Sequence, residues 1–280
     1  MKKSLIALAI AAASTSAFAA ADISGQIKVI VAGDNYTPSF DNELTAKTSD
    51  DLGGGLSAFG QVTLDLDATA ADANQMKDMK VGVKGAFGTV IAGRMETIME
   101  GVVSEQFNDG ASVHTGVTQT ESNLTAIGRV NAVAYVSPTV NGFHVAVAGT
   151  LDGADTDLFT HVDMAAVYDL GTLKLIAAKT DFATGDDITA YTASYGMGDV
   201  TIAAGRFEQG TADDTIVSVN YKMGPIGLYA AHKSSSATDG DVTSLKATYA
   251  LSKSTAVWVG NRSKQGANAD VTHFGIITKF

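Results

Sequence analysis

The sequence has no cysteine, and it has only three prolines and one tryptophan in 280 residues. The absence of cysteine excludes both a disulfide framework and a thiolate metal site. After the first 21 residues, no apolar run approaches the roughly 18 residues that a membrane-spanning helix needs. A mature chain that crosses a membrane must therefore cross it as a β-barrel. The 29 glycines and the scarcity of leucine and glutamate runs argue against a helical protein.

Basic residues are also scarce. When Lys2 and Lys3 of the N-terminal leader are left out, 17 basic residues stand against 30 acidic ones, which gives a net charge of −13. Nucleic-acid binding is disfavoured, because phosphate contacts need a basic surface.

Sequence signals of catalysis are missing as well. There is no His-x-x-x-His pair for a metal and no Gly-x-Ser-x-Gly elbow for a nucleophile. The histidines are scattered singly, at His114, His144, His161, His232 and His273. We therefore expect no enzyme activity, no metal and no cofactor.

Residues 1–21 have the pattern of a secretory signal peptide. Lys2 and Lys3 precede an apolar run from Leu5 to Ala13, and Ala17-Phe18-Ala19 provides a small-x-small cleavage site. The apolar run is too short for a spanning helix. The sequence therefore predicts an exported protein whose single mature domain covers residues 22–280.

The mature chain alternates apolar and polar residues with a period of two, which is typical of β-strands. In the segment 56–67, for example, Val62 and Leu64 share one face while Gln61 and Thr63 share the other. Sixteen such segments can be counted, and an even number returns both termini to the same side of a barrel. They cover residues 22–33, 42–51, 56–67, 76–87, 89–96, 129–138, 143–152, 157–170, 173–183, 186–196, 200–209, 213–223, 226–236, 241–251, 254–264 and 270–280.

Alternation also fits a soluble β-sandwich, so the position of the tyrosines decides between the two folds. Five tyrosines each lie three residues before a Pro, Gly or Ser that opens a short turn, and this spacing predicts an aromatic girdle at one membrane interface. In the best-patterned strands they share a face with apolar residues, which predicts an apolar outer face and a polar inner face. The five are Tyr135, Tyr168, Tyr195, Tyr221 and Tyr249.

One connection, residues 95–128, is far longer than the turns around it. Near its start, apolar residues recur at helical spacing, and they predict one or two amphipathic turns that need an apolar wall. The apolar side contains Ile98, Met99, Val102, Val103 and Phe107. The opposite side contains Thr97, Glu100, Ser104 and Glu105.

This region resembles the third hairpin and constriction loop of the general porins of Gram-negative bacteria. The resemblance rests on the turn Phe87-Gly88-Thr89, a strand ending Gly93-Arg94, a long acidic loop with a short helix, Arg129-Val130-Asn131, and Tyr-Val-Ser-Pro-Thr-Val-Asn-Gly-Phe at 135–143. It implies a homotrimeric outer-membrane β-barrel of 16 antiparallel strands, exported through the periplasm, whose third loop folds inward. The stretch 129–138 is one residue shorter than the family pattern, which leaves the facing of Arg129 open.

The same resemblance implies a pore constriction in which basic wall residues face carboxylates of the third loop. Arg94 and Arg129 match the motif directly, whereas Lys28, Lys47 and Lys80 match by strand and parity. The acidic candidates are Glu96, Glu100, Glu105 and Asp109. The alternative for these carboxylates is ordinary solvated loop charge.

The resemblance thus implies a passive, water-filled channel for ions and small hydrophilic solutes. A substrate-selective porin is an alternative, since Phe59 and Tyr229 face inward by parity. A non-channel surface barrel or adhesin is a second alternative, although the short outer loops disfavour it.

Overall fold

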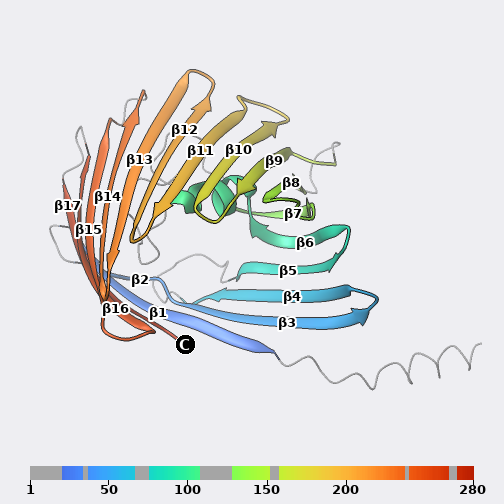
Figure 1. Cartoon of the computed structure of the whole chain (residues 1–280), viewed down its shortest axis with the longest axis horizontal. Helices are drawn as coiled ribbons and strands as arrows, with labels where there is room; N and C mark the ends of the chain where they lie inside the picture. The colour runs from blue at the N-terminus through green and yellow to red at the C-terminus, as the bar shows by residue number, and fades with distance from the viewer. Residues whose placement is uncertain are drawn as a thin grey trace, which may run out of the picture.

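The chain folds into a closed antiparallel β-barrel (Figure 1). The structure is a computed structural model that describes residues 21–33, 37–66, 76–107, 128–151, 158–236, 240–264 and 270–280. The predicted leader lies outside these ranges apart from Ala21, so its boundary stays a prediction. The strands are β1 (Asp22–Ala32), β2 (Thr37–Phe40), β3 (Glu43–Gly53), β4 (Leu56–Asp65), β5 (Met76–Gly85), β6 (Gly88–Glu96), β7 (Arg129–Val136), β8 (Phe143–Thr150), β9 (His161–Asp169), β10 (Leu173–Phe182), β11 (Ile188–Met197), β12 (Val200–Gln209), β13 (Ala212–Met223), β14 (Ile226–Ser235), β15 (Val242–Ala250), β16 (Thr255–Lys264) and β17 (Val271–Lys279).

These elements make a barrel of sixteen strands, as the sequence predicts, because β2 and β3 are two parts of one barrel strand. Both parts pair with β1, and only Asp41 and Asn42 separate them. Asn42 bridges the gap, since its side-chain oxygen accepts a 2.9 Å hydrogen bond from the backbone N–H of Lys28. The barrel closes where β1 pairs with β17.

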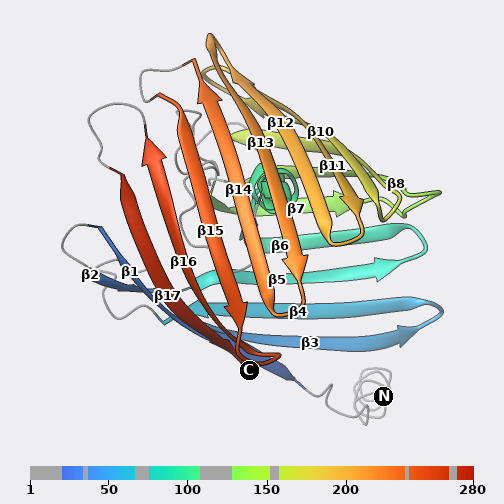
Figure 2. The same cartoon turned by 60° about the vertical axis from the view of Figure 1, so that its left-hand side comes forward.

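Outside the strands, the described part of the chain has two short helical segments, η1 (Met99–Val103) and η2 (Ser104–Phe107). Figures 1 and 2 show them within the curve of the sheet rather than on its outside. No helix among the described residues is both long enough and apolar enough to cross a membrane.

The two faces of the barrel wall differ in the way that a lipid environment requires. On β15, Leu245 is 56% exposed, whereas its neighbours Ser244 and Lys246 are 1% and 5% exposed. Exposed apolar and buried polar side chains reverse the usual order of a soluble protein. Tyr195 and Tyr249 are exposed close to the short turns, as expected for an aromatic girdle.

The expectation of a uniformly polar inner face is wrong for part of the wall. There the inner face is built mainly of alanine, because the helical segments pack on it and small side chains let them approach closely. The buried alanines of this wall are Ala132, Ala134, Ala146, Ala148, Ala165, Ala178, Ala190, Ala203 and Ala231.

Candidate channel constriction

The apolar side of η1 and η2 fills a hollow in the alanine wall. Met99, Val103 and Phe107 are each at most 1% exposed, and they belong to the same cluster as the wall alanines. A Cβ atom on Gly205 of β12 would lie 2.6 Å from the Phe107 ring, so this position has room only for glycine. The sequence predicts the amphipathic turns correctly, and the wall that they need is the inner face of the barrel.

Two hydroxyl groups that were expected on the opposite side of the helix are buried instead. Thr97 and Ser104 are 2% and 8% exposed. Each bonds back to the helical backbone: Thr97 Oγ1 accepts a hydrogen bond from the N–H of Glu100, and Ser104 Oγ donates one to the carbonyl oxygen of Met99. Hydroxyl side chains that bond locally in this way need no solvent, which is why helical periodicity alone places them wrongly.

Side chains of the barrel wall bind the helical segments at both ends. Asp163 of β9 accepts a 3.1 Å hydrogen bond from the backbone N–H of Ile98, and Tyr229 of β14 donates a 2.7 Å hydrogen bond to the carbonyl oxygen of Phe107. Between these ends, Ser194 Oγ donates to Gln106 Oε1 at 2.9 Å. The segment 98–107 is therefore attached to strands far apart around the barrel.

The first group of charges lies where β5, β6 and β7 approach the start of η1. Arg129 donates from Nε to Asp78 at 3.2 Å and from Nη2 to Glu96 at 2.5 Å. Lys80 lies 3.7 Å from the same Asp78, which also accepts a hydrogen bond from Gln61. The facing of Arg129, which the sequence leaves open, is thus toward these inner residues.

Two loop carboxylates lie beside this group. Glu105 is exposed, whereas Oε2 of Glu100 is buried and has no hydrogen-bond partner among the described residues. Burial raises the pKa of Glu100 above its ordinary value of 4.5, and the negative charge of Glu96 raises it further, although Arg129 opposes the shift. The carboxyl of Glu100 consequently loses its charge at a higher pH than an ordinary glutamate does.

A second group of charges, near the break between β2 and β3, contains the predicted Lys28 together with Lys77, which the sequence analysis missed. Lys77 binds Asp41 at 3.0 Å, Glu43 at 2.6 Å and Asp65 at 3.6 Å, and Lys28 binds Asp41 at 2.9 Å. Strict alternation places Lys77 on the outer face. A register shift between Thr63 and Leu64 turns Lys77 to the inner face instead.

The remaining candidates lie elsewhere. Lys47 pairs with Gln61 in a row that continues to Lys80, and it forms no ion pair with any described residue. Arg94 does not join the inner groups: it shares the outer face of β6 with Val90 and Ala92, and its Nε donates to the carbonyl oxygen of Met76 at 3.2 Å. Asp109 lies outside the described residues.

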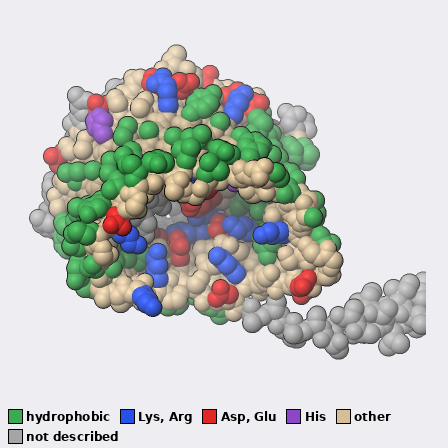
Figure 3. Space-filling view, in the orientation of Figure 1, with side chains coloured by type: hydrophobic (Ala, Val, Ile, Leu, Met, Phe, Trp, Pro, Cys, Tyr) green, Lys and Arg blue, Asp and Glu red, His purple; other side chains and the backbone are tan. Residues whose placement is uncertain are grey.

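Figure 3 shows the open interior of the barrel, with basic and acidic side chains gathered inside it.

No group of three or more potential metal ligands occurs among the described residues. A model of the Gram-negative porin family matches residues 5–276. The chain belongs to this family. As a Gram-negative porin, it is an outer-membrane channel protein.

Solved porin structures share the fold of this porin at low sequence identity. The anion-selective porin from Comamonas acidovorans has a TM-score of 0.71 and 18% identity, with 94% of this chain and all of that chain covered. Salmonella typhi OmpF in complex with daunomycin has a TM-score of 0.75 and 17% identity, with 94% and 98% covered. An engineered variant of the Rhodopseudomonas blastica porin has a TM-score of 0.79 and 16% identity, with 93% and 100% covered. Among curated protein sequences, none matches this porin.

Proposed function

We propose that this porin is a general diffusion channel, without enzyme activity, whose narrowest part lies between the segment 98–107 and the inner faces of β1 and β3–β7. The observation that carries this proposal is the attachment of a charged helical segment to the inner wall, directly beside two groups of wall charges. The constriction residues are then Lys28, Lys47, Lys80, Arg129, Glu96, Glu100 and Glu105. Arg94 is left out because its pairing partner Met79 is 51% exposed and because it forms no ion pair with a described residue.

The charges at this constriction are nearly balanced. Among the constriction residues that the structure describes, the basic groups are five, namely Lys28, Lys47, Lys77, Lys80 and Arg129. The carboxylates are seven, namely Asp41, Glu43, Asp65, Asp78, Glu96, Glu100 and Glu105. Most of the basic groups already bind wall carboxylates, which weakens the transverse field that the family resemblance implies. Because low-dielectric walls focus the remaining charge, the excess of two carboxylates supports a weak preference for cations.

Single-channel recording in a planar bilayer tests the proposal. A general diffusion channel gives a conductance that rises with salt concentration without saturating. Under a potassium chloride gradient, its zero-current potential has the sign of cation preference. The complete absence of conductance from correctly folded protein would indicate a non-channel barrel and would overturn the proposal.

A substrate-selective channel is the second candidate, because one inner depression combines aromatic and polar groups. Phe59 covers Gly82 so closely that a Cβ atom there would lie 2.4 Å from the ring. Beside it, Asp22, Lys47, Ser49 and Gln61 line a depression of about 330 Å³. Saturation of the conductance by one small solute, abolished by Phe59→Ala, would favour this candidate.

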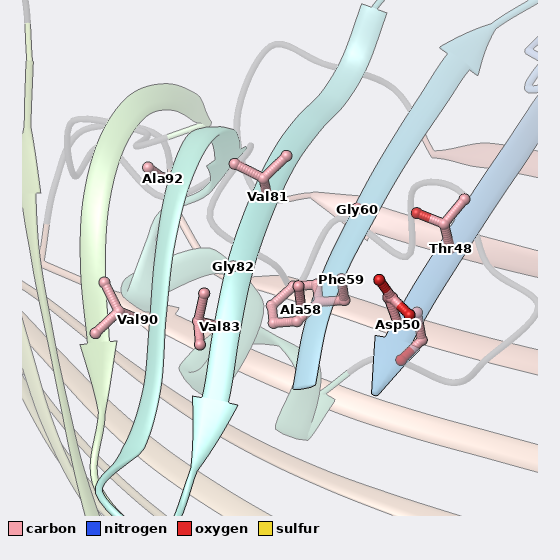
Figure 4. Close-up of a pocket in the computed structure, with 11 residues that line it drawn as sticks. Thr48, Asp50, Ala58, Phe59, Gly60, Val81, Gly82, Val83, Val90 and Ala92 are labelled. Carbon is pink, nitrogen blue, oxygen red and sulfur yellow. The ribbon is translucent and has the colours of Figure 1, made fainter. Parts of the chain in front are cut away.

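The outer face of β3–β6 supports assembly of this porin into a homotrimer in the outer-membrane lipid. Small side chains leave a groove of about 510 Å³ there, lined by Thr48, Ala58, Gly60 and Ala92 and flanked by Val81 (Figure 4). A neighbouring copy that fills such a groove removes apolar surface from lipid and packs closely. Chemical crosslinking in native membranes tests the trimer.

The leader sequence supports export through the periplasm with removal of residues 1–21. N-terminal sequencing of the mature protein tests this removal.

A further inference from the structure

The helical segment 98–107 is bound to the barrel wall at each end by one buried side chain. Asp163 binds the first end and Tyr229 binds the second, and these residues are 2% and 5% exposed. We propose that Asp163 and Tyr229 are positioning residues: together they hold Glu100 and Glu105 at a fixed place in the channel and so determine its ion selectivity. This inference rests on the proposed function, because it assumes that ions pass the segment 98–107.

Asp163 is a costly residue in its position, which suggests a role beyond filling space. A buried carboxylate loses its hydration, and the loss must be offset by hydrogen bonds. Asp163 has two such bonds: Ile98 donates its backbone N–H to Oδ2, and Thr180 donates its hydroxyl to Oδ1 at 2.7 Å. No ion pair with another residue in the described part of the chain neutralises it. Neighbouring positions on this wall are occupied by alanine, which would pack here without the free-energy cost of burying a carboxylate. Alanine, however, could not accept the hydrogen bond from the start of the helical segment.

Tyr229 acts at the other end, where Asn220 and Lys246 are its paired neighbours on the two adjacent strands. Its hydroxyl donates to the carbonyl oxygen of Phe107, the last residue of η2. The Phe107 ring lies over Gly205 and against Phe207, with ring centroids 6.2 Å apart. Tyr229 thus fixes the backbone of a residue whose side chain the wall already holds.

The two attachments have a joint consequence because the acidic residues lie between them. Asp163 is on β9 and Tyr229 is on β14, so the segment spans several strands of the wall. With both ends held, Glu100 stays beside Arg129. With one end released, the segment can tilt, and the position of both glutamates relative to the wall charges changes. Loss of hydrogen bonds to a charged group shifts such an equilibrium by about tenfold or more.

The first test compares two variants that remove the same charge. In Asp163→Asn, the side-chain oxygen can still accept from Ile98 and the amide can donate to Thr180, whereas Asp163→Leu retains neither bond. In planar bilayers we expect the Leu variant to spend about ten times longer than wild type in substates of altered conductance and to have a shifted zero-current potential. We expect the Asn variant to behave as wild type. Equal behaviour of the Asn and Leu variants would overturn the inference.

The second test removes only one hydroxyl group and therefore also applies if the Leu variant fails to fold. Tyr229→Phe loses the bond to Phe107, and Tyr191→Phe is its control, since Tyr191 lies on the outer face and is 55% exposed. The inference requires altered substates in Tyr229→Phe and none in the control. Unchanged substates and selectivity in Tyr229→Phe would overturn it. If wild-type protein conducts and only these comparisons fail, the proposed channel function still stands, whereas a wild-type protein without conductance refutes that function itself.

Discussion

Reversal of Glu100 and Glu105 to lysine should convert the weak cation preference into an anion preference. The double substitution changes the charge balance at the constriction from two excess carboxylates to two excess basic groups. At about 8 Å, the screening length at physiological salt, one unit charge contributes about 0.5 kcal/mol to a monovalent ion in water. Four units of change then amount to about 2 kcal/mol, or about 30-fold in cation occupancy, before screening reduces the effect.

The assay is the zero-current potential of channels in a planar bilayer under a potassium chloride gradient. The variant with Glu100→Gln and Glu105→Gln should fall between wild type and the lysine variant, because it changes the charge by only two units. Asp186→Lys with Asp199→Lys is the matched control, since both carboxylates are exposed in the connections before and after β11 and belong to neither group of constriction charges. Equal shifts from the test pair and the control pair, or no graded order among the three channels, would refute the reasoning.

Three further predictions follow from other parts of the barrel. The cation preference should weaken as the pH falls, and the change should begin above pH 4.5, because the pKa of Glu100 is raised and this carboxyl loses its charge earlier than an ordinary one. The zero-current potential measured against pH checks this, and in Glu100→Gln the change should be smaller and begin at a lower pH. The folded barrel should migrate differently in detergent gels before and after boiling and should give a β-type circular dichroism spectrum, since sixteen hydrogen-bonded strands resist detergent; a helical spectrum contradicts the fold. Deletion of Phe280 should lower the amount of protein in the outer membrane more than the amount synthesised, because Phe280 exchanges two backbone hydrogen bonds with Gly25 where the barrel closes. Cell fractionation measures both quantities, and normal outer-membrane abundance would argue against this role.

Much of the fold is predictable from the sequence because the side-chain period of two is a local property. The lipid outside the barrel requires an apolar side chain at Leu245, whereas the interior of the barrel accepts a polar one at Lys246. This difference can be read from the sequence without any tertiary information. The helical turns after Thr97 are predictable for the same reason. The alanine wall is harder to predict, since its composition makes sense only once the helical segment is known to lie on it.

The constriction is less predictable than the fold because it depends on departures from regularity. Lys77 reaches three carboxylates only through a register shift, which alternation cannot reveal. Arg94 matches the family motif in sequence, yet it pairs with the exposed Met79, whereas Glu96, two residues later on the same strand, binds Arg129 of the inner group. Asp163 and Tyr229 are single polar residues on otherwise ordinary strands, and only the path of a distant loop shows what they bind.

The alanine wall has a consequence for the shape of the permeation path. Because buried apolar side chains fill the space between that wall and the segment 98–107, the path is eccentric and follows the charged side of the barrel. The width of the channel is therefore smaller than the circumference of the barrel would indicate. A solute contacts one polar wall rather than a symmetrical ring of polar groups. Substitutions intended to change the width of the channel should accordingly be made first on β3–β6. There they alter the water-filled path without disturbing the packing of the helical segment on the alanine wall.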